Sequence, residues 1–147
     1  MTSIGEQKVI LITGASSGFG KAFAALLASH GYKVFGTSRK ADYSETNGYT
    51  MIPMDVTDDK SVDEAVKYVH DHSGQIDVIV NNAGFGIAGA IEDTSVNEAK
   101  ALFETNFFGV HRICRTVIPI LRSQGYGHII NIGSLGGVVS IPFQAFY

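Results

Sequence analysis

The amino-acid sequence predicts an α/β protein built on a doubly wound parallel sheet. Short apolar runs alternate with longer segments of helical periodicity along the whole chain. The apolar runs are continuous rather than alternating, which is typical of strands that are buried on both faces. Strands joined by helices of this length form right-handed crossovers, and such crossovers place helices on both faces of a parallel sheet.

The first half of the chain supplies three of the predicted strands. Residues 8–13 (KVILIT) form a continuous apolar run, and a glycine-rich turn separates them from a helix predicted over 21–30. Gly31 follows that helix at the position where glycine commonly ends one. Residues 33–37 and 50–54 then predict a second strand and a short third strand.

The second half supplies two more strands and two long helices. Residues 58–73 carry an apolar stripe with helical spacing, and residues 76–80 (IDVIV) predict the fourth strand. A long helix is predicted over 95–123, beginning from a serine N-cap, and a fifth strand over 128–132. The expected buried stripe of the long helix comprises Val96, Ala99, Phe103, Phe107, Val110, Cys114 and Val117.

Length and composition favour one soluble domain over residues 1–147. The chain is 45% hydrophobic and 17% charged, which excludes a disordered segment. Its net charge of −3, with interspersed signs, argues against a nucleic-acid partner or an anionic membrane surface. No apolar stretch approaches the ~18 residues of a membrane span. A single cysteine fits a reducing compartment, so we expect a cytoplasmic location.

Glycines and hydroxyl side chains follow the first strand, at the edge of the sheet where doubly wound proteins bind their ligands. Segment 13–20 reads TGASSGFG, and its glycines would let the backbone turn tightly and approach a phosphate at the helix N-terminus. Its G-x-x-x-G-x-G spacing differs from the common G-x-G-x-x-G fingerprint, and alanines at positions 15 and 22 exclude an NTP-binding P-loop. Taken alone, the segment is equally compatible with an ordinary strand–helix turn.

Polar residues also follow the later strands. Asn81 and Asn82 leave the apolar fourth strand, where each amide requires a hydrogen-bond partner from the backbone or from a ligand. For Asn81, a structural network between strand ends is at least as good an interpretation as ligand contact. Asn106 lies in the long helix, where asparagine competes with helical hydrogen bonds. Taken separately, Ser134 after the fifth strand is typical of a turn residue and Tyr147 of a core residue.

In combination, these motifs resemble the short-chain dehydrogenase/reductase family across essentially the whole chain. The matching residues are the TGASSGFG segment, Asp55 and Val56 after the third strand, the NNAG segment at 81–84, Asn106, Ser134 and Tyr147. The resemblance implies a Rossmann-type sheet of strand order 3-2-1-4-5. It also implies that the protein interconverts a secondary alcohol and a ketone or aldehyde by hydride transfer to or from a nicotinamide cofactor.

The resemblance implies roles for individual residues as well. Tyr147 would be the general acid/base, Ser134 would orient the substrate oxygen, and Asn106 would hold a water in a proton relay. The implied cofactor-binding residues are Gly14, Ser16, Ser17, Gly18, Phe19, Gly20, Ser38, Arg39, Asp55, Val56, Asn82, Ala83 and Gly84. We expect no metal site, because His70 and His72 lie two positions apart on a helix and point to different faces.

The tip of the second predicted strand bears on the choice of cofactor. A carboxylate about 20 residues beyond the glycines would bind the ribose 2′-hydroxyl of NAD, but residues 36–40 read GTSRK. Small hydroxyls and the planar guanidinium of Arg39 suit a 2′-phosphate better. We therefore expect NADP to be preferred over NAD. The alternative is that Arg39 and Lys40 form a solvated basic corner.

The family pattern continues as Tyr-x-x-x-Lys, so its lysine would fall at position 151, after the last residue of this sequence. We therefore expect an N-terminal part of a protein of about 250 residues, without the C-terminal strands and helices and inactive by itself. At full length we expect a homodimer or homotetramer. The apolar segment 85–91 resembles that of relatives acting on steroids, retinoids and lipids, which favours an apolar substrate. A non-catalytic NADP sensor and a partner-binding pseudoenzyme are the alternatives.

Overall fold

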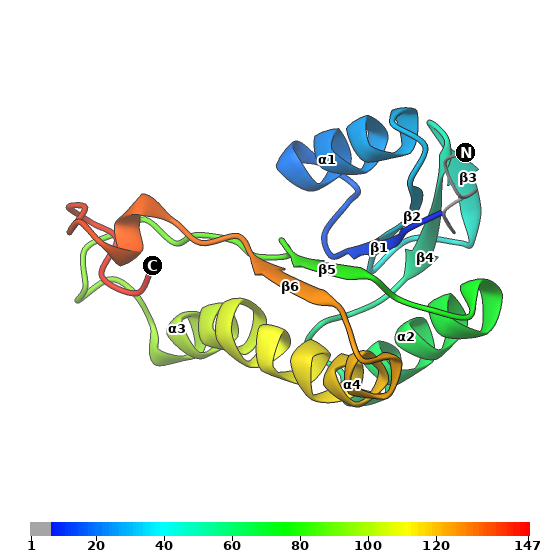
Figure 1. Cartoon of the computed structure of the whole chain (residues 1–147). Helices are drawn as coiled ribbons and strands as arrows, with labels where there is room; N and C mark the ends of the chain where they lie inside the picture. The colour runs from blue at the N-terminus through cyan, green and yellow to red at the C-terminus, as the bar shows by residue number, and fades with distance from the viewer. Residues whose placement is uncertain (1–6) are drawn as a thin grey trace.

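A computed structural model describes residues 7–147, so the first six residues of the predicted domain lie outside it. Helices cover both faces of one sheet (Figure 1). The strands of this described part are β1 (Val9–Ile12), β2 (Lys33–Ser38), β3 (Ser44–Thr46), β4 (Tyr49–Pro53), β5 (Val78–Asn81) and β6 (His128–Asn131). The helical elements are α1 (Gly18–Ser29), α2 (Asp59–Ser73), α3 (Val96–Phe103), the π-helical turn η1 (Glu104–Phe108), α4 (Gly109–Gln124) and the 3₁₀ turn η2 (Leu135–Gly137).

The strand order confirms the predicted doubly wound sheet. Within residues 7–147 the order is β3-β4-β2-β1-β5-β6, and every pair except β3–β4 is parallel. Without β3, this is the predicted order 3-2-1-4-5. The chain first builds outward from β1 through β2 and β4, and then returns to the other side of β1 with β5 and β6. The reversal places the topological switch point between the carboxyl ends of β1 and β5.

Strand β3, an antiparallel strand at the outer edge of β4, was not predicted from the sequence. Its residues are polar and largely exposed, so no apolar periodicity marks it. The turn between β3 and β4 contains Asn47 and Gly48, both at positive φ (47° and 80°). An Asn-Gly pair of this kind is a strong local signal for a two-residue hairpin, and it could have revealed the strand.

Two apolar layers, one on each face of the sheet, form the core. The larger layer lies between the sheet and helices α2 and α4, where Val66 and Val117 are buried with Leu11 of β1. The smaller layer lies between the sheet and α1, where Ala24 is buried with Ile12 of β1. Leu11 and Ile12 are both 0% exposed. The central strand is therefore covered on both faces, as its continuous apolar run predicts.

The predicted single helix over 95–123 is wrong in its middle. Ser95 caps α3 as expected, but η1 interrupts the α-helical hydrogen bonding before α4 begins. A π turn adds a residue and rotates the preceding part of the helix relative to the part after the turn. The predicted stripe is accordingly wrong before the turn and within it, where Val96 is 69% and Phe107 is 61% exposed, and correct after it at Val117.

In the described residues, no helix is both long and apolar enough to cross a membrane.

We expect Leu11→Ala to lower the free energy of unfolding by about 2–5 kcal/mol, because it leaves a cavity in the larger apolar layer. Leu26→Ala is the matched control, since Leu26 is 56% exposed on α1 and its truncation should change stability by less than about 0.5 kcal/mol. Urea unfolding of both variants measures the difference. Equal losses in the two variants would contradict the assignment of the core.

Candidate functional site

A cleft of about 970 Å³ opens at the carboxyl ends of the parallel strands. The cleft-lining residues that the sequence predicted are Gly14, Ser16, Ser17, Gly18, Phe19, Ser38, Arg39, Asp55, Val56, Asn82, Ala83, Gly84, Asn106, Ser134 and Tyr147. Gly20 is the predicted site residue that does not line it. Segments far apart in the sequence therefore meet around one cavity at the switch point of the sheet.

The glycine-rich turn after β1 lies directly against the loop after β5. Gly14 has a φ of +67°, and a Cβ at this position would lie 2.9 Å from Cα of Ala83. Gly18 also has a positive φ, of +53°. Gly20 is buried beneath the turn, where a Cβ would lie 2.4 Å from the carbonyl oxygen of Gly14 and 2.5 Å from Nδ2 of Asn82. Gly20 is thus needed for close packing under the cleft rather than for lining it.

Thr13 and Asn82 join the two loops through four hydrogen bonds. The hydroxyl oxygen of Thr13 accepts from the backbone N–H groups of Asn82 (2.9 Å) and Ala83 (2.8 Å). In return, Nδ2 of Asn82 donates to the carbonyl oxygens of Thr13 (2.9 Å) and Gly14 (3.2 Å). Thr13 is 1% exposed. The prediction of site residues omitted Thr13, and the signal that could have found it is a hydroxyl side chain at the end of a buried apolar strand.

Asn81 forms a structural bond between two strand ends, which is one of the two roles that the sequence allowed for it. Its Nδ2 donates to Oδ1 of Asn131 at 2.8 Å, so the two amides join β5 and β6 at the end of their register. Asn81 is 3% exposed. Its Oδ1 is buried and, among the described residues, has no hydrogen-bond partner.

The tip of β2 forms the basic wall of the cleft. Its backbone is attached to the glycine-rich turn, because the N–H of Ala15 donates to the carbonyl oxygen of Thr37 at 2.8 Å. Ser38 and Arg39 line the cleft, and Arg39 is exposed to it. Thr37 lines it as well, and its buried hydroxyl oxygen has no partner within residues 7–147. A buried hydroxyl of this kind needs a hydrogen-bond partner, which a bound ligand could supply.

Asp55, which follows β4, uses its carboxylate to shape its own loop. Oδ1 accepts hydrogen bonds from the backbone N–H (2.9 Å) and the hydroxyl (2.7 Å) of Thr57. Burial by itself would raise the pKa of Asp55, but these two bonds and the charges of Arg39 and Arg112 outweigh it and lower the pKa below its ordinary value. Asp55 therefore stays ionised and adds one negative charge near the basic tip of β2.

Asn106 lines the cleft and is held there by the backbone of Phe85. Its Nδ2 donates to the carbonyl oxygen of Phe85 at 2.8 Å, and its Oδ1 accepts from the N–H of Phe85 at 3.1 Å. A Cβ on Gly84 would lie 3.0 Å from the same Oδ1, so the small residue allows the close approach. An amide has two N–H donors and two lone pairs, so Asn106 keeps one donor and one acceptor position for a further partner.

Ser134 and Tyr147 lie on the last segment of the chain and line the same cleft. The hydroxyl of Ser134 accepts from the N–H of Gly136 at 3.1 Å and begins the turn η2. The ring of Tyr147 lies between two glycines, since a Cβ on Gly86 would be 3.6 Å and one on Gly136 3.5 Å from its ring carbons. No hydrogen bond joins the two hydroxyls in the part of the chain that the structure describes.

His72, one of the two histidines of α2, has a local structural partner. His72 stacks on Tyr68 with ring centroids 3.8 Å apart, and its Nδ1 lies 2.8 Å from the carbonyl oxygen of Tyr68. Among residues 7–147, no group of three or more His, Cys, Asp or Glu side chains could hold a metal ion.

Comparisons with known proteins match nearly the whole chain. The model of the family described as short chain dehydrogenase matches residues 8–147. A 3-ketodihydrosphingosine reductase from Bacteroides thetaiotaomicron is 48% identical over 143 residues, which cover 97% of this chain and 52% of that protein. A 3-oxoacyl-[acyl-carrier-protein] reductase, FabG, from Vibrio cholerae is 36% identical over 149 residues, which cover 97% of this chain and 61% of that protein.

A solved structure of a short-chain dehydrogenase is also similar to this chain. The crystal structure of a short-chain dehydrogenase from Streptomyces avermitilis has a TM-score of 0.88 at 38% identity, and the match covers 96% of this chain and 54% of that one. The chain spans about half the length of the curated relatives it matches. Because the family match extends over nearly every residue, this chain belongs to the short-chain dehydrogenase/reductase family.

Proposed function

We propose that this chain forms the cofactor-binding part of an NADP-dependent oxidoreductase that interconverts a secondary alcohol and a ketone on a long, apolar substrate. The observation that carries the proposal is the composition of the cleft. A glycine-rich turn, a basic strand tip and the polar side chains of Asn106, Ser134 and Tyr147 line one cavity at the switch point of the sheet.

The described residues fit a nicotinamide dinucleotide. The backbone at Gly14 and Gly18 has positive φ, and the N-terminus of α1 directly follows the turn, an arrangement that favours a pyrophosphate. The orphaned hydroxyl of Thr37 would gain a hydrogen-bond partner from a nucleotide in the cleft. When bound, a nicotinamide cofactor supplies or accepts the hydride.

The protein's own side chains would manage the proton. In the direction of reduction, the phenol of Tyr147 would donate its proton to the substrate oxygen, and it would take the proton back during alcohol oxidation. Ser134 would orient that oxygen by a hydrogen bond from its hydroxyl. Asn106 would hold a water through its remaining N–H and lone pair while Phe85 fixes the orientation of the amide.

The preference for NADP rests on charge at the tip of β2. Arg39 is exposed to the cleft beside Ser38, and a guanidinium binds a phosphate through paired, charge-assisted hydrogen bonds. The nearby carboxylate of Asp55 is already engaged by Thr57. The solved structures of ElxO with NADP bound (TM-score 0.89, 28% identity) and of a 3-ketoacyl-(acyl-carrier-protein) reductase from Brucella melitensis complexed with NADH (TM-score 0.88, 31% identity) support a nicotinamide cofactor, and the choice of NADP rests on Arg39.

The proposed substrate is a long-chain 3-keto lipid or the corresponding alcohol. Phe85 is 43% and Ile91 is 63% exposed in the segment that leaves the cleft after β5, so an apolar chain would find apolar contacts there. The name of the Bacteroides thetaiotaomicron relative, a 3-ketodihydrosphingosine reductase, supports a substrate of this class.

We expect Arg39→Asp to raise the Kd for NADPH by at least about tenfold and to leave the Kd for NADH within about threefold. The substitution places a carboxylate against the 2′-phosphate, which only NADPH carries. Lys40→Asp is the matched control, because Lys40 is the neighbouring exposed cation and does not line the cleft. Fluorescence titration of the 147-residue chain measures all affinities. Equal weakening of both cofactors, or an equal effect of Lys40→Asp, would show that Arg39 does not discriminate.

We expect Tyr147→Phe to reduce turnover by about 10²-fold or more, because it removes the proton donor and leaves the ring in place. The assay follows NADPH oxidation with a long-chain 3-keto lipid. It uses a chimera in which the C-terminal half of the Bacteroides thetaiotaomicron reductase continues the chain after Tyr147. Tyr126→Phe is the control, since Tyr126 is 51% exposed and does not line the cleft.

Turnover that survives Tyr147→Phe would refute the role of this tyrosine. A chimera that binds NADPH but reduces none of a panel of apolar ketones would favour a non-catalytic NADP-binding protein instead.

A further inference from the structure

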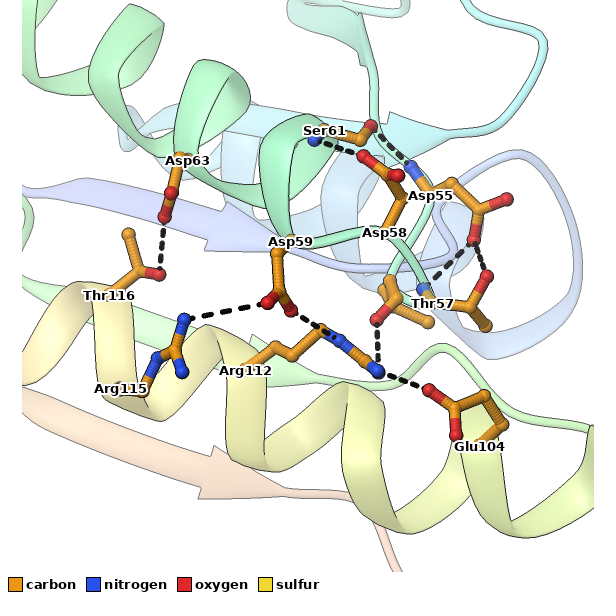
Figure 2. A network of polar contacts seen from close by, with 11 residues as sticks. Asp55, Thr57, Asp58, Asp59, Ser61, Asp63, Glu104, Arg112, Arg115 and Thr116 are labelled. Carbon is orange, nitrogen blue, oxygen red and sulfur yellow. Dashed lines mark hydrogen bonds and ion pairs between the residues drawn. The ribbon is translucent and has the colours of Figure 1, made fainter. Parts of the chain in front are cut away.

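The π-helical turn η1 carries Asn106 into the cleft. A π turn is rare and has weaker hydrogen bonding than an α-helix, so contacts from outside the turn must help to hold it. On the cleft side, Asn106 makes its two hydrogen bonds to Phe85. On the opposite side, Glu104, the first residue of the turn, is bound by Arg112 of α4 (Figure 2).

Each of the three guanidinium nitrogens of Arg112 donates one hydrogen bond, and the three acceptors lie on two segments of the chain. Nε donates to Oδ1 of Asp59 at 2.6 Å, Nη2 donates to Oε1 of Glu104, and Nη1 donates to the carbonyl oxygen of Val56 at 3.3 Å (Figure 2). The side chain is 20% exposed. Burial alone would lower the pKa of Arg112, but its bonds to Glu104 and Asp59 raise it, so the group stays charged.

These acceptors lie on two segments that both contribute residues to the cleft. Asp59 begins α2, and Val56 lines the cleft between β4 and α2. The start of α4 lies directly against this segment, since a Cβ on Gly109 would be 2.9 Å from Cγ2 of Val56. Arg112 therefore connects the segment that follows Asp55 with the turn that carries Asn106.

We infer that Arg112 is a positioning residue of the site. It fixes η1 against the segment before α2 and thereby keeps the amide of Asn106 on the backbone of Phe85. The inference rests on the proposed function, in which the orientation of that amide matters for the proton relay. A lysine could not replace Arg112 fully, because a point charge lacks the planar fork that reaches three acceptors at once.

Arg115 provides a matched comparison on the same helix. It also pairs with Asp59, but at 3.6 Å and with its side chain 64% exposed. An ion pair of this kind contributes little to stability. Arg115 has no ion pair with η1 among the described residues, so its removal should leave Asn106 where it is.

The test is native-state hydrogen exchange of the Phe85 N–H in the 147-residue chain without cofactor. The rate is compared with that of the Thr13 N–H, which donates to the carbonyl oxygen of Val80 in the core of the sheet. Asn106→Ala gives the largest acceleration expected for the Phe85 N–H, because it removes the acceptor of that group. We expect Arg112→Met to accelerate Phe85 relative to Thr13 by at least about tenfold, and Arg112→Lys to give an intermediate value.

Two controls separate positioning from general loss of stability. Arg115→Ala removes the exposed arginine, and Val117→Ala removes buried apolar volume from the same helix, where Val117 is 0% exposed. Arg115→Ala should leave the ratio of the Phe85 rate to the Thr13 rate within about twofold of the wild-type value. Val117→Ala lowers the thermal midpoint and should not raise this ratio, because a global loss of stability accelerates exchange of the core Thr13 N–H at least as much as exchange of the Phe85 N–H.

The inference is overturned if Arg112→Met leaves the ratio unchanged, or if Val117→Ala raises it equally at a similar loss of thermal midpoint. If Arg112→Met does not fold, Arg112→Lys decides: a raised ratio supports the inference and an unchanged ratio overturns it. The exchange measurement requires no cofactor, whereas the proposed function fails if the wild-type chain does not bind NADPH. The two failures are therefore distinguishable.

Discussion

The hydroxyl of Thr13 is the contact on which the geometry of the cleft depends. It accepts from two successive backbone N–H groups of the loop after β5, and the amide of Asn82 returns two bonds to the turn after β1. Parallel strands end side by side, but their loops would otherwise be free to separate. By joining these loops at the switch point of the sheet, the four bonds fix the floor of the cleft.

The rest of the site follows from this contact. Because the two loops are joined, the glycine-rich turn lies close enough to Ala83 that only Gly14 fits, and Gly20 fills the space beneath it. The loop after β5 then leads to Phe85, which holds Asn106. From Asn106, the turn η1 connects through Arg112 back to the segment beside Asp55 (Figure 2). In each of these bonds except the one between Arg112 and Glu104, one of the two partners is a backbone group, so the fold fixes that end of the bond.

Local patterns predicted most of the fold. The helix over 58–73 was readable from its apolar stripe, in which Val62, Val66 and Val69 are buried, and from Gly74, which ends it in the left-handed conformation. The central strand was readable because it is apolar along its whole length. Strand β3 and the turn η1 were not readable from the sequence. Strand β3 is polar, and over only five residues the pattern of a π turn does not differ from that of an α-helix.

The residues of the cleft were predicted from motifs, most of them after strands, and from the family resemblance that these motifs carry, whereas the residues that support them were not predicted. Arg112 resembles any polar residue of an amphipathic helix, and its three partners lie between 8 and 56 positions away in the sequence. Thr13 was part of a recognised motif, yet its partners come from a loop 69 and 70 positions later. Only the assembled sheet brings such groups together.

The most direct measurement is the affinity of Thr13→Val for NADPH, with Thr13→Ser as the control. Valine has nearly the same shape but leaves the partly buried N–H groups of Asn82 and Ala83 without their acceptor, at a cost of up to about 1–3 kcal/mol for each group. We predict that Thr13→Val remains folded by circular dichroism and binds NADPH at least about tenfold more weakly, while Thr13→Ser stays within about threefold of the wild-type chain. A folded Thr13→Val chain with wild-type affinity for NADPH would contradict the central role of this hydroxyl.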